Sequence, residues 1–258
     1  MSRGIWQQLA ALTPARIGLG RTGSAQTTAE TLRFALAHAT ARDAVHTPFD
    51  ADKVASDIAA LGLATLVADS AADSRQTYLL RPDLGRRLSA EARDRLAAAA
   101  AAPIDLALVV GDGLSSSAVH AHASAMVSAL LPHIRREGWS LGPVVVARQA
   151  RVALGDEVGE ILNARLVLVL IGERPGLSSP DSLGLYLTHA PRQGRNDGER
   201  NCISNIHGAG LSPDIAAFKA AWLMREALAR RLTGVALKDE SDRTLEAAER
   251  PFTLQRPG

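Results

Sequence analysis

The residues with the most evident chemical capacity lie between Arg195 and Leu211, in a polar, glycine-bearing stretch that we expect to be a loop. It contains Cys202, the only cysteine of the chain, and His207 five residues later. A thiol and an imidazole can act as a nucleophile and its base, but such pairs meet in space rather than at a fixed sequence spacing. A lone cysteine is also commonly a small buried apolar residue. The residues alone leave both interpretations of Cys202 open.

A different use of His207 is suggested by its neighbours. The segment N-I-H-G-A-G, which starts at Asn205, differs in one residue from D-x-H-x-x-G, the pattern of proteins whose histidine replaces the lower ligand of cobalamin. In that pattern the Asp is the charged partner that orients the ligating histidine. Asn205 lacks this charge, so the pattern is incomplete here.

Ser115 is the candidate nucleophile of another chemistry, with His207 as its base. It lies in G-D-G-L-S-S-S, residues 111–117, which lacks the G-x-S-x-G pattern of α/β hydrolases. The segment also lacks the glycine spacing of the phosphate-binding and dinucleotide-binding loops. The other interpretation is a tight turn from a strand into a helix, with a serine as the helix cap.

Several charged side chains are candidates for ligand contacts. Glu173 and Arg174 directly follow the most apolar segment, where they can pair with each other or meet a polar ligand. Arg81, Arg86 and Arg87 can bind phosphate, because a guanidinium presents a rigid fork of donors. Ion pairs on the surface are the more common use of such arginines.

The pattern of apolar residues after residue 103 predicts strands that alternate with helices. Strands that are almost continuously apolar are typical of a parallel sheet covered on both faces. We therefore predict a doubly wound, Rossmann-like α/β domain with a mostly parallel sheet. The predicted strands are 104–110, 143–147, 165–171 and 183–187. One helix is expected to end near Gly138, a second to span 156–162 and a third to begin at Ser212-Pro213-Asp214.

The first hundred residues are predicted to form a helical layer on that domain. A helix capped by Ser24 is expected to carry Leu32 and Leu36 at helical spacing, and core packing and contact with a partner chain explain these apolar residues equally well. Two short apolar runs around a polar turn predict a β-hairpin. Helices are also predicted over 52–61 and 89–102, and the hairpin strands over 65–68 and 77–80. The chain is thus divided into a helical region, 1–102, and an α/β domain, 103–258.

Ligands of a doubly wound sheet bind beyond the carboxyl ends of its strands. Three polar segments follow the predicted strands at that edge: 111–117, 148–152 and 172–177. We expect the functional site where these three segments meet.

The composition excludes several classes of protein. The chain has 258 residues, a net charge of +2 and one cysteine, which excludes a disulfide framework and a cysteine-rich zinc site. No apolar run reaches the about 18 residues of a membrane span. The N-terminus has no apolar core after its first arginine, so we expect no secretory signal. The small net charge gives no indication of nucleic-acid binding.

Taken together, the polar segments resemble one family. T-P-A-R-I-G-L-G-R-T-G, L-L-R-P-D-L-G-R-R-L, G-D-G-L-S, G-E-I-L, L-I-G-E-R-P-G-L and N-C-I-S-N-I-H occur in this order. The chain is similar in this respect to the small (light) subunit of ethanolamine ammonia-lyase, from about Leu12 to about Arg231. The combination of G-E-R-P-G-L with C-I-S-N-I-H is highly specific to that family.

The resemblance implies a function that the residues by themselves do not show. The family's holoenzyme uses adenosylcobalamin to convert ethanolamine to acetaldehyde and ammonia by a radical rearrangement, and the small subunit forms part of the cobalamin site. The large subunit, a (β/α)8 barrel, holds the substrate and most catalytic groups. The implied assembly is a hetero-oligomer with six of each chain.

For individual residues, the resemblance implies cobalamin contacts at Val152, Glu173 and Cys202, and no catalytic residue in this chain. The family keeps the cofactor's own nucleotide base on cobalt, so His207 is expected not to be a metal ligand.

The resemblance also implies a location. We expect a cytoplasmic protein, with a bacterial microcompartment as the second location. Some members carry a long N-terminal extension for such targeting, and this chain begins close to the conserved region. The sequence therefore leaves targeting to a microcompartment open.

Two other functions stay open. A free-standing α/β-hydrolase-like enzyme that uses Ser115 and His207 predicts esterase activity from this chain alone. A nucleotide-binding regulatory module predicts thermal stabilisation by nucleotides. The lyase subunit predicts activity only with a large partner chain and added adenosylcobalamin.

Overall fold

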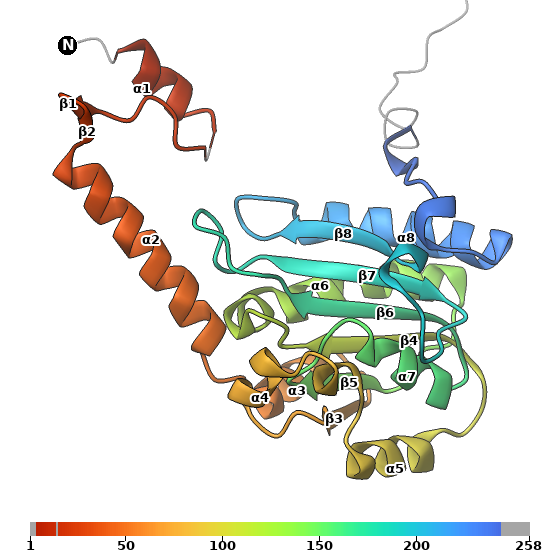
Figure 1. Ribbon diagram of the computed structural model, residues 1–258. Helices are drawn as coiled ribbons and strands as arrows, with labels where there is room; N and C mark the ends of the chain where they lie inside the picture. Colours follow the sequence, from red (N-terminus) through yellow and green to blue (C-terminus); the bar gives the residue numbers. More distant parts are fainter. Residues whose placement is uncertain (1–3, 14, 244–258) are drawn as a thin grey trace, which may run out of the picture.

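The computed structural model describes residues 4–13 and 15–243, and it shows an α/β fold built on one six-stranded sheet (Figure 1). The strand order is β3-β5-β4-β6-β7-β8. The first four strands in this order run parallel, whereas β7 is antiparallel to both of its neighbours. The predicted α/β class with a mostly parallel sheet is confirmed. The strands are β3 (Thr65–Asp69), β4 (Ile104–Gly111), β5 (Val144–Arg148), β6 (Ala164–Gly172), β7 (Leu183–His189) and β8 (Asn201–Ile206).

Helices cover the two faces of the sheet unequally. The first face carries α3 (Ala51–Ala59), α6 (Ser116–Glu137) and α8 (Pro213–Arg230). These helices share its apolar core with β5, β4, β6, β7 and β8. The second face carries α5 (Ala90–Ala99) and α7 (Leu154–Ile161), whose core ends at β6. In Figure 1, α6 and α8 lie behind the sheet, and the near side of β7 and β8 has no helix over it. The second face is therefore open along these two strands.

The ends of the two long helices follow the sequence signals. Ser115 caps α6 by accepting a hydrogen bond from the Ala118 N–H, and Gly138 ends this helix in a left-handed conformation. Ser212 caps α8 in the same way, directly before Pro213. The predicted starts of both helices are confirmed.

The predicted β-hairpin in the first hundred residues is wrong. Residues 65–69 form β3, which pairs in parallel with β5. Residues 77–80 belong to the helix α4 (Arg75–Leu80), which is capped by Ser74. A four-residue apolar run does not reveal its period, and the buried Tyr78 ring favours the helix here. The division of the chain at residue 102 stays a prediction, although the sheet takes β3 from before that boundary.

The expected loop over 195–211 is also wrong in part. A short 3₁₀ helix, η2 (Asp197–Glu199), leads into β8, the strand at the edge of the sheet. An edge strand with one open face keeps polar side chains on that face, and this hid its periodicity.

The N-terminal part of the chain forms an arm that projects from the body (Figure 1). This N-terminal arm comprises residues 5–46, and its long helix α2 is capped by Thr27 rather than Ser24. Only Ala44 of α2 is buried. Leu32 and Leu36, for which the sequence left core packing and contact with a partner chain open, are 65% and 66% exposed. The arm's elements are α1 (Ile5–Ala10), β1 (Arg21–Thr22), β2 (Ala25–Gln26) and α2 (Thr28–His46).

None of the helices in the described residues has the length and apolar content needed to cross a bilayer.

A first prediction concerns the free energy of unfolding of the isolated chain. Changing both Leu32 and Leu36 to Gln should alter it by less than about 0.5 kcal/mol, because these side chains contact little of the body. The control, Leu168→Ala in the fully buried centre of β6, should cost about 2–5 kcal/mol. Urea unfolding followed by circular dichroism measures both. Similar losses in the two variants would show that α2 packs against the body in solution.

Candidate functional site

The segments that follow β4, β5 and β6 meet at the carboxyl edge of the sheet, as the sequence predicts. They enclose an open hollow of about 470 Å³. Its lining includes two of the three residues predicted to contact a cofactor, Val152 and Glu173. The other lining residues used below are Tyr78, Gly113, Arg151, Ile171, Tyr186 and Ser204.

Glu173 is fixed by residues from β7 and β8. Its Oε2 accepts hydrogen bonds from the Ser182 hydroxyl at 2.6 Å and from the Asn205 N–H at 3.3 Å. Its Oε1 has no hydrogen-bond partner among the described residues. Gly184 makes room for the side chain, because a Cβ atom there would lie 2.8 Å from Oε1. The geometry therefore leaves one carboxylate oxygen of Glu173 free to accept a hydrogen bond from a ligand.

Val152 lies in the short connection between β5 and α7, and it packs partly against the core of the second face. Its neighbour Arg151 lies over the ring of Tyr78, with Cζ 4.5 Å from the centroid. Arg75 contacts the same ring at 4.7 Å. Arg151 also donates a hydrogen bond from Nη2 to the Tyr78 carbonyl at 3.0 Å. This stack fixes the backbone that carries Val152.

A buried carboxylate joins the same connection to β4. Asp112 follows β4 directly, and its Oδ1 accepts a hydrogen bond from the Ala150 N–H at 2.9 Å. Arg75 lies 3.5 Å from its Oδ2 and donates to the Gly113 carbonyl at 2.8 Å. Burial raises the pKa of Asp112 to about 6. Sequence reasoning missed Asp112, Arg75 and Tyr78, since residues so far apart give no joint pattern.

Cys202 lies outside the hollow but on the same open face of the sheet. It pairs with Tyr186, whose ring lines the hollow, and its Sγ is 3.1 Å from the Ser204 hydroxyl. The side chain is exposed. The interpretation of Cys202 as a small buried apolar residue is therefore wrong.

His207 has both ring nitrogens engaged within its own turn. Nε2 is 2.8 Å from the Asn205 side-chain oxygen, and Nδ1 accepts a hydrogen bond from the Ala209 N–H at 3.3 Å. The ring is buried, and Gly210 packs closely against it. These bonds pair His207 with neither Cys202 nor Ser115.

Ser115 is buried and serves the fold. Its hydroxyl caps α6 and donates a hydrogen bond to the Pro180 carbonyl at 2.9 Å. This is the helix-cap interpretation of the G-D-G-L-S-S-S segment. The hydroxyl is not poised for attack, so the structure does not support the hydrolase alternative.

The hollow has the groups to bind a ligand. Val152, Ile171 and Tyr186 give it an apolar wall, and Glu173 provides an acceptor at its rim. No three His, Cys, Asp or Glu side chains within the described residues are grouped as a metal site. Such a wall suits a broad ligand with an apolar face and polar edges.

Comparison with known proteins gives one consistent result. Residues 3–238 match the model of the ethanolamine ammonia-lyase light chain family. The chain is 59% identical over 252 residues to an ethanolamine ammonia-lyase small subunit from Rhodopseudomonas palustris, covering 98% of this chain and 96% of that protein. It is 60% identical over 234 residues to the Bradyrhizobium diazoefficiens small subunit, covering 90% of each. The Xanthomonas campestris small subunit is 55% identical over 262 residues, with 98% and 96% covered.

A second prediction concerns Asp112 and pH. The raised pKa means that the folded state binds the Asp112 proton more tightly than the unfolded state, whose pKa is near 3.8. The wild-type chain should therefore lose stability relative to Asp112→Asn as the pH rises from about 4 to about 6. With one pKa unit worth about 1.4 kcal/mol, this relative loss should reach about 2 kcal/mol between these two pH values.

Urea unfolding of both proteins across this pH range measures the difference in the free energy of unfolding. Groups other than Asp112 are shared by the two proteins and cancel in that difference. A difference that does not change with pH would show that Asp112 titrates in the folded chain as it does in water.

Proposed function

This chain belongs to the ethanolamine ammonia-lyase light chain family, and we propose that it forms part of the adenosylcobalamin site of that carbon–nitrogen lyase. Family membership makes it a subunit of an enzyme of ethanolamine deamination. The finer assignment, to the cofactor site, is supported by one observation above the others. Val152, Glu173 and Cys202, the three residues expected to contact cobalamin, all lie at the open end of one sheet face.

The residues present fit such a cofactor. Cobalamin has a wide corrin ring with amide arms at its edge, so it needs an apolar wall and scattered hydrogen-bond partners. Val152, Tyr186 and the exposed face around Cys202 form a wall of this kind. Glu173 Oε1 is free to accept from an amide arm or a ribose hydroxyl. When bound, the cofactor supplies the radical chemistry, and this chain binds and orients it.

We propose that the partner is the large subunit, as the name "small subunit" of the relatives implies. The family resemblance assigns ethanolamine and most of the groups that act on it to that partner. The exposed apolar residues of the N-terminal arm, among them Leu32 and Leu36, provide a surface for that partner. The assembly would contain six of each chain, in the cytoplasm or in a bacterial microcompartment.

A third prediction tests the function as a whole. Co-expression with the large subunit should give a complex that releases acetaldehyde from ethanolamine only when adenosylcobalamin is added. Each chain alone should be inactive, because one lacks the substrate site and the other lacks part of the cofactor site. Turnover that does not depend on the cofactor, or failure of the chains to associate, would contradict the proposal.

A fourth prediction tests the role of Glu173. In the assembled complex, Glu173→Ala should weaken adenosylcobalamin binding by about tenfold, as expected when a charged hydrogen-bond acceptor is lost. Equilibrium dialysis gives the dissociation constant. Glu91→Ala, an exposed glutamate on α5, is the matched control and should leave it unchanged. Equal affinities of wild type and Glu173→Ala would exclude the contact.

A further inference from the structure

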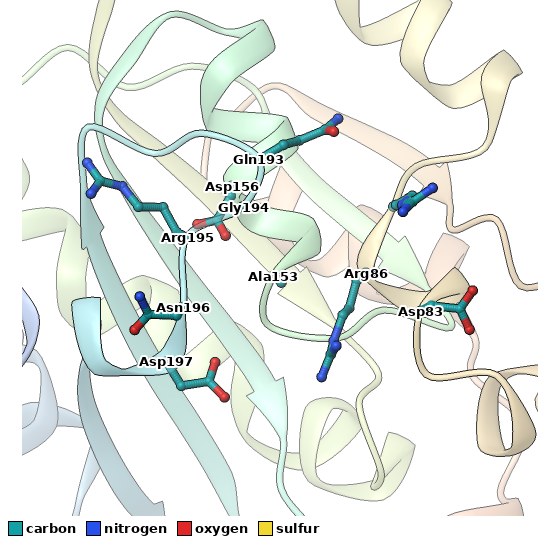
Figure 2. Close-up of a pocket in the computed structure, with 10 residues that line it drawn as sticks. Asp83, Arg86, Ala153, Asp156, Gln193, Gly194, Arg195, Asn196 and Asp197 are labelled. Carbon is teal, nitrogen blue, oxygen red and sulfur yellow. The ribbon is translucent and has the colours of Figure 1, made fainter.

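A second hollow lies next to the first, on the other side of the turn that carries Val152. Its volume is about 440 Å³. Arg151 and Val152 line the first hollow, and the following residue, Ala153, lines the second. Figure 2 shows the Arg86 side chain extending alongside Ala153, with the segment 193–197 across the hollow from it. The two hollows therefore share one wall.

Every carboxylate that lines the second hollow has an arginine partner. Asp83 is paired with Arg81, at 3.0 Å and 2.8 Å. Asp156 is buried and forms a double hydrogen bond with Arg200, with both distances 2.6 Å. Asp197 lies 3.5 Å from the Nε of the same arginine. The three carboxylates therefore share two arginines, Arg81 and Arg200, and one negative charge of the lining is left unbalanced.

The arginines of the lining are used differently. Arg195 pairs with Glu199 and donates hydrogen bonds to the Ala190 carbonyl. Arg86 and Arg87 have no hydrogen bond or ion pair from their side chains among the described residues. Two exposed guanidinium groups are thus without an ion pair in the described part of the chain, against one unbalanced carboxylate, which leaves the lining with one net positive charge. The hollow is a candidate site for one anion, and guanidinium groups favour phosphate oxygens.

The backbone that carries these two arginines is tied to the first hollow. The Gly85 carbonyl accepts a hydrogen bond from the Arg151 N–H at 2.8 Å, and Gly85 packs against the Tyr78 ring. On the other side, the Leu88 N–H donates to Glu157 of α7 at 2.8 Å. The positions of Arg86 and Arg87 relative to Val152 are therefore set by the fold.

We propose that Arg86 and Arg87 bind the phosphodiester of the cofactor's nucleotide arm while the corrin ring lies on the first hollow. This inference rests on the proposed function. Cobalamin carries one phosphodiester, on an arm that leaves the edge of the ring, so ring and phosphate require neighbouring sites of different chemistry. The first hollow provides an apolar wall, and the second provides two arginines whose side chains have no ion pair among the described residues. A free phosphate shares this anionic chemistry, and the experiment separates the two sources.

The test compares cobalamin with cobinamide, a corrinoid that lacks the nucleotide arm and its phosphate. Both are dialysed against the assembled complex of large and small subunits, carrying either wild-type chain or Arg86→Gln/Arg87→Gln. The double variant should bind cobalamin at least tenfold more weakly, as lost charge-assisted hydrogen bonds predict, and cobinamide within about threefold of wild type. Arg230→Gln, at an exposed arginine at the end of α8 that pairs with Glu226 away from both hollows, is the control and should change neither affinity.

Inorganic phosphate provides the second arm of the test. It should compete with cobalamin for the wild-type complex and have no such effect on the double variant. One outcome would favour a free-phosphate site and overturn the inference. In it, phosphate binds at Arg86 and Arg87, but cobalamin and cobinamide bind the wild type equally. Equal losses for both corrinoids in the double variant would also overturn it, because the arginines would then act on the ring or the fold.

The failure of the proposed function is distinguishable from these outcomes. A wild-type complex that binds neither corrinoid would remove the cofactor site itself, and the inference with it. Binding of both corrinoids to the wild type, with cobalamin affinity unchanged in the double variant, would leave the cofactor site in place and overturn the phosphate contact alone. Circular dichroism of each variant verifies that its fold is intact.

Discussion

The ring of Tyr78, buried between the guanidiniums of Arg75 and Arg151, is the contact on which the geometry of both hollows depends. Burial of this ring raises its pKa to about 12, and contacts of this kind contribute about 0.5–2 kcal/mol each. Through the two arginines, the ring connects the segments after β4 and β5 with the turn at Gly85. Arg75 also donates to the Val45 carbonyl, so the base of the N-terminal arm is tied to the same contact. The segments that form the site are held in place by Arg75 and Tyr78, which both belong to the helix α4.

How far the sequence predicts the fold depends on how completely each element is buried. β4, β6 and the caps of α6 and α8 were predictable, because strands buried on both faces are continuously apolar and caps use a small set of residues. β8 was not, since its open face carries Cys202 and Ser204, and its pattern resembles a polar loop. α2 was predicted from the spacing of Leu32 and Leu36, but periodicity does not say whether the core or another molecule will cover an apolar face.

The candidate site shows the same limit in its chemistry. The positions of Val152 and Glu173 followed from family resemblance and from the rule that ligands bind at the carboxyl edge. The alternatives built on His207 were decided by local backbone geometry, because Asn205 has a positive φ of 66° and turns its side chain onto the imidazole. The pairing of Asp112 with Arg75 joins residues distant in sequence, and such a pair is visible only after the chain has folded. The two unpaired arginines had been candidates for phosphate, and only the structure separates them from Arg81.

The exposed helix α2 has a consequence for how the cell must make this protein. Leu32 and Phe34 are two residues apart, so they point about 200° apart around the helix axis, and both are exposed. An isolated helix of this kind is marginal in water, and uncovered apolar surface attracts chaperones, proteases and other copies of the chain. Under the proposed function the large subunit covers this arm, and chains made in excess of that subunit keep the apolar surface exposed. Balanced synthesis of the two chains is then a condition that the shape of this one imposes on its expression.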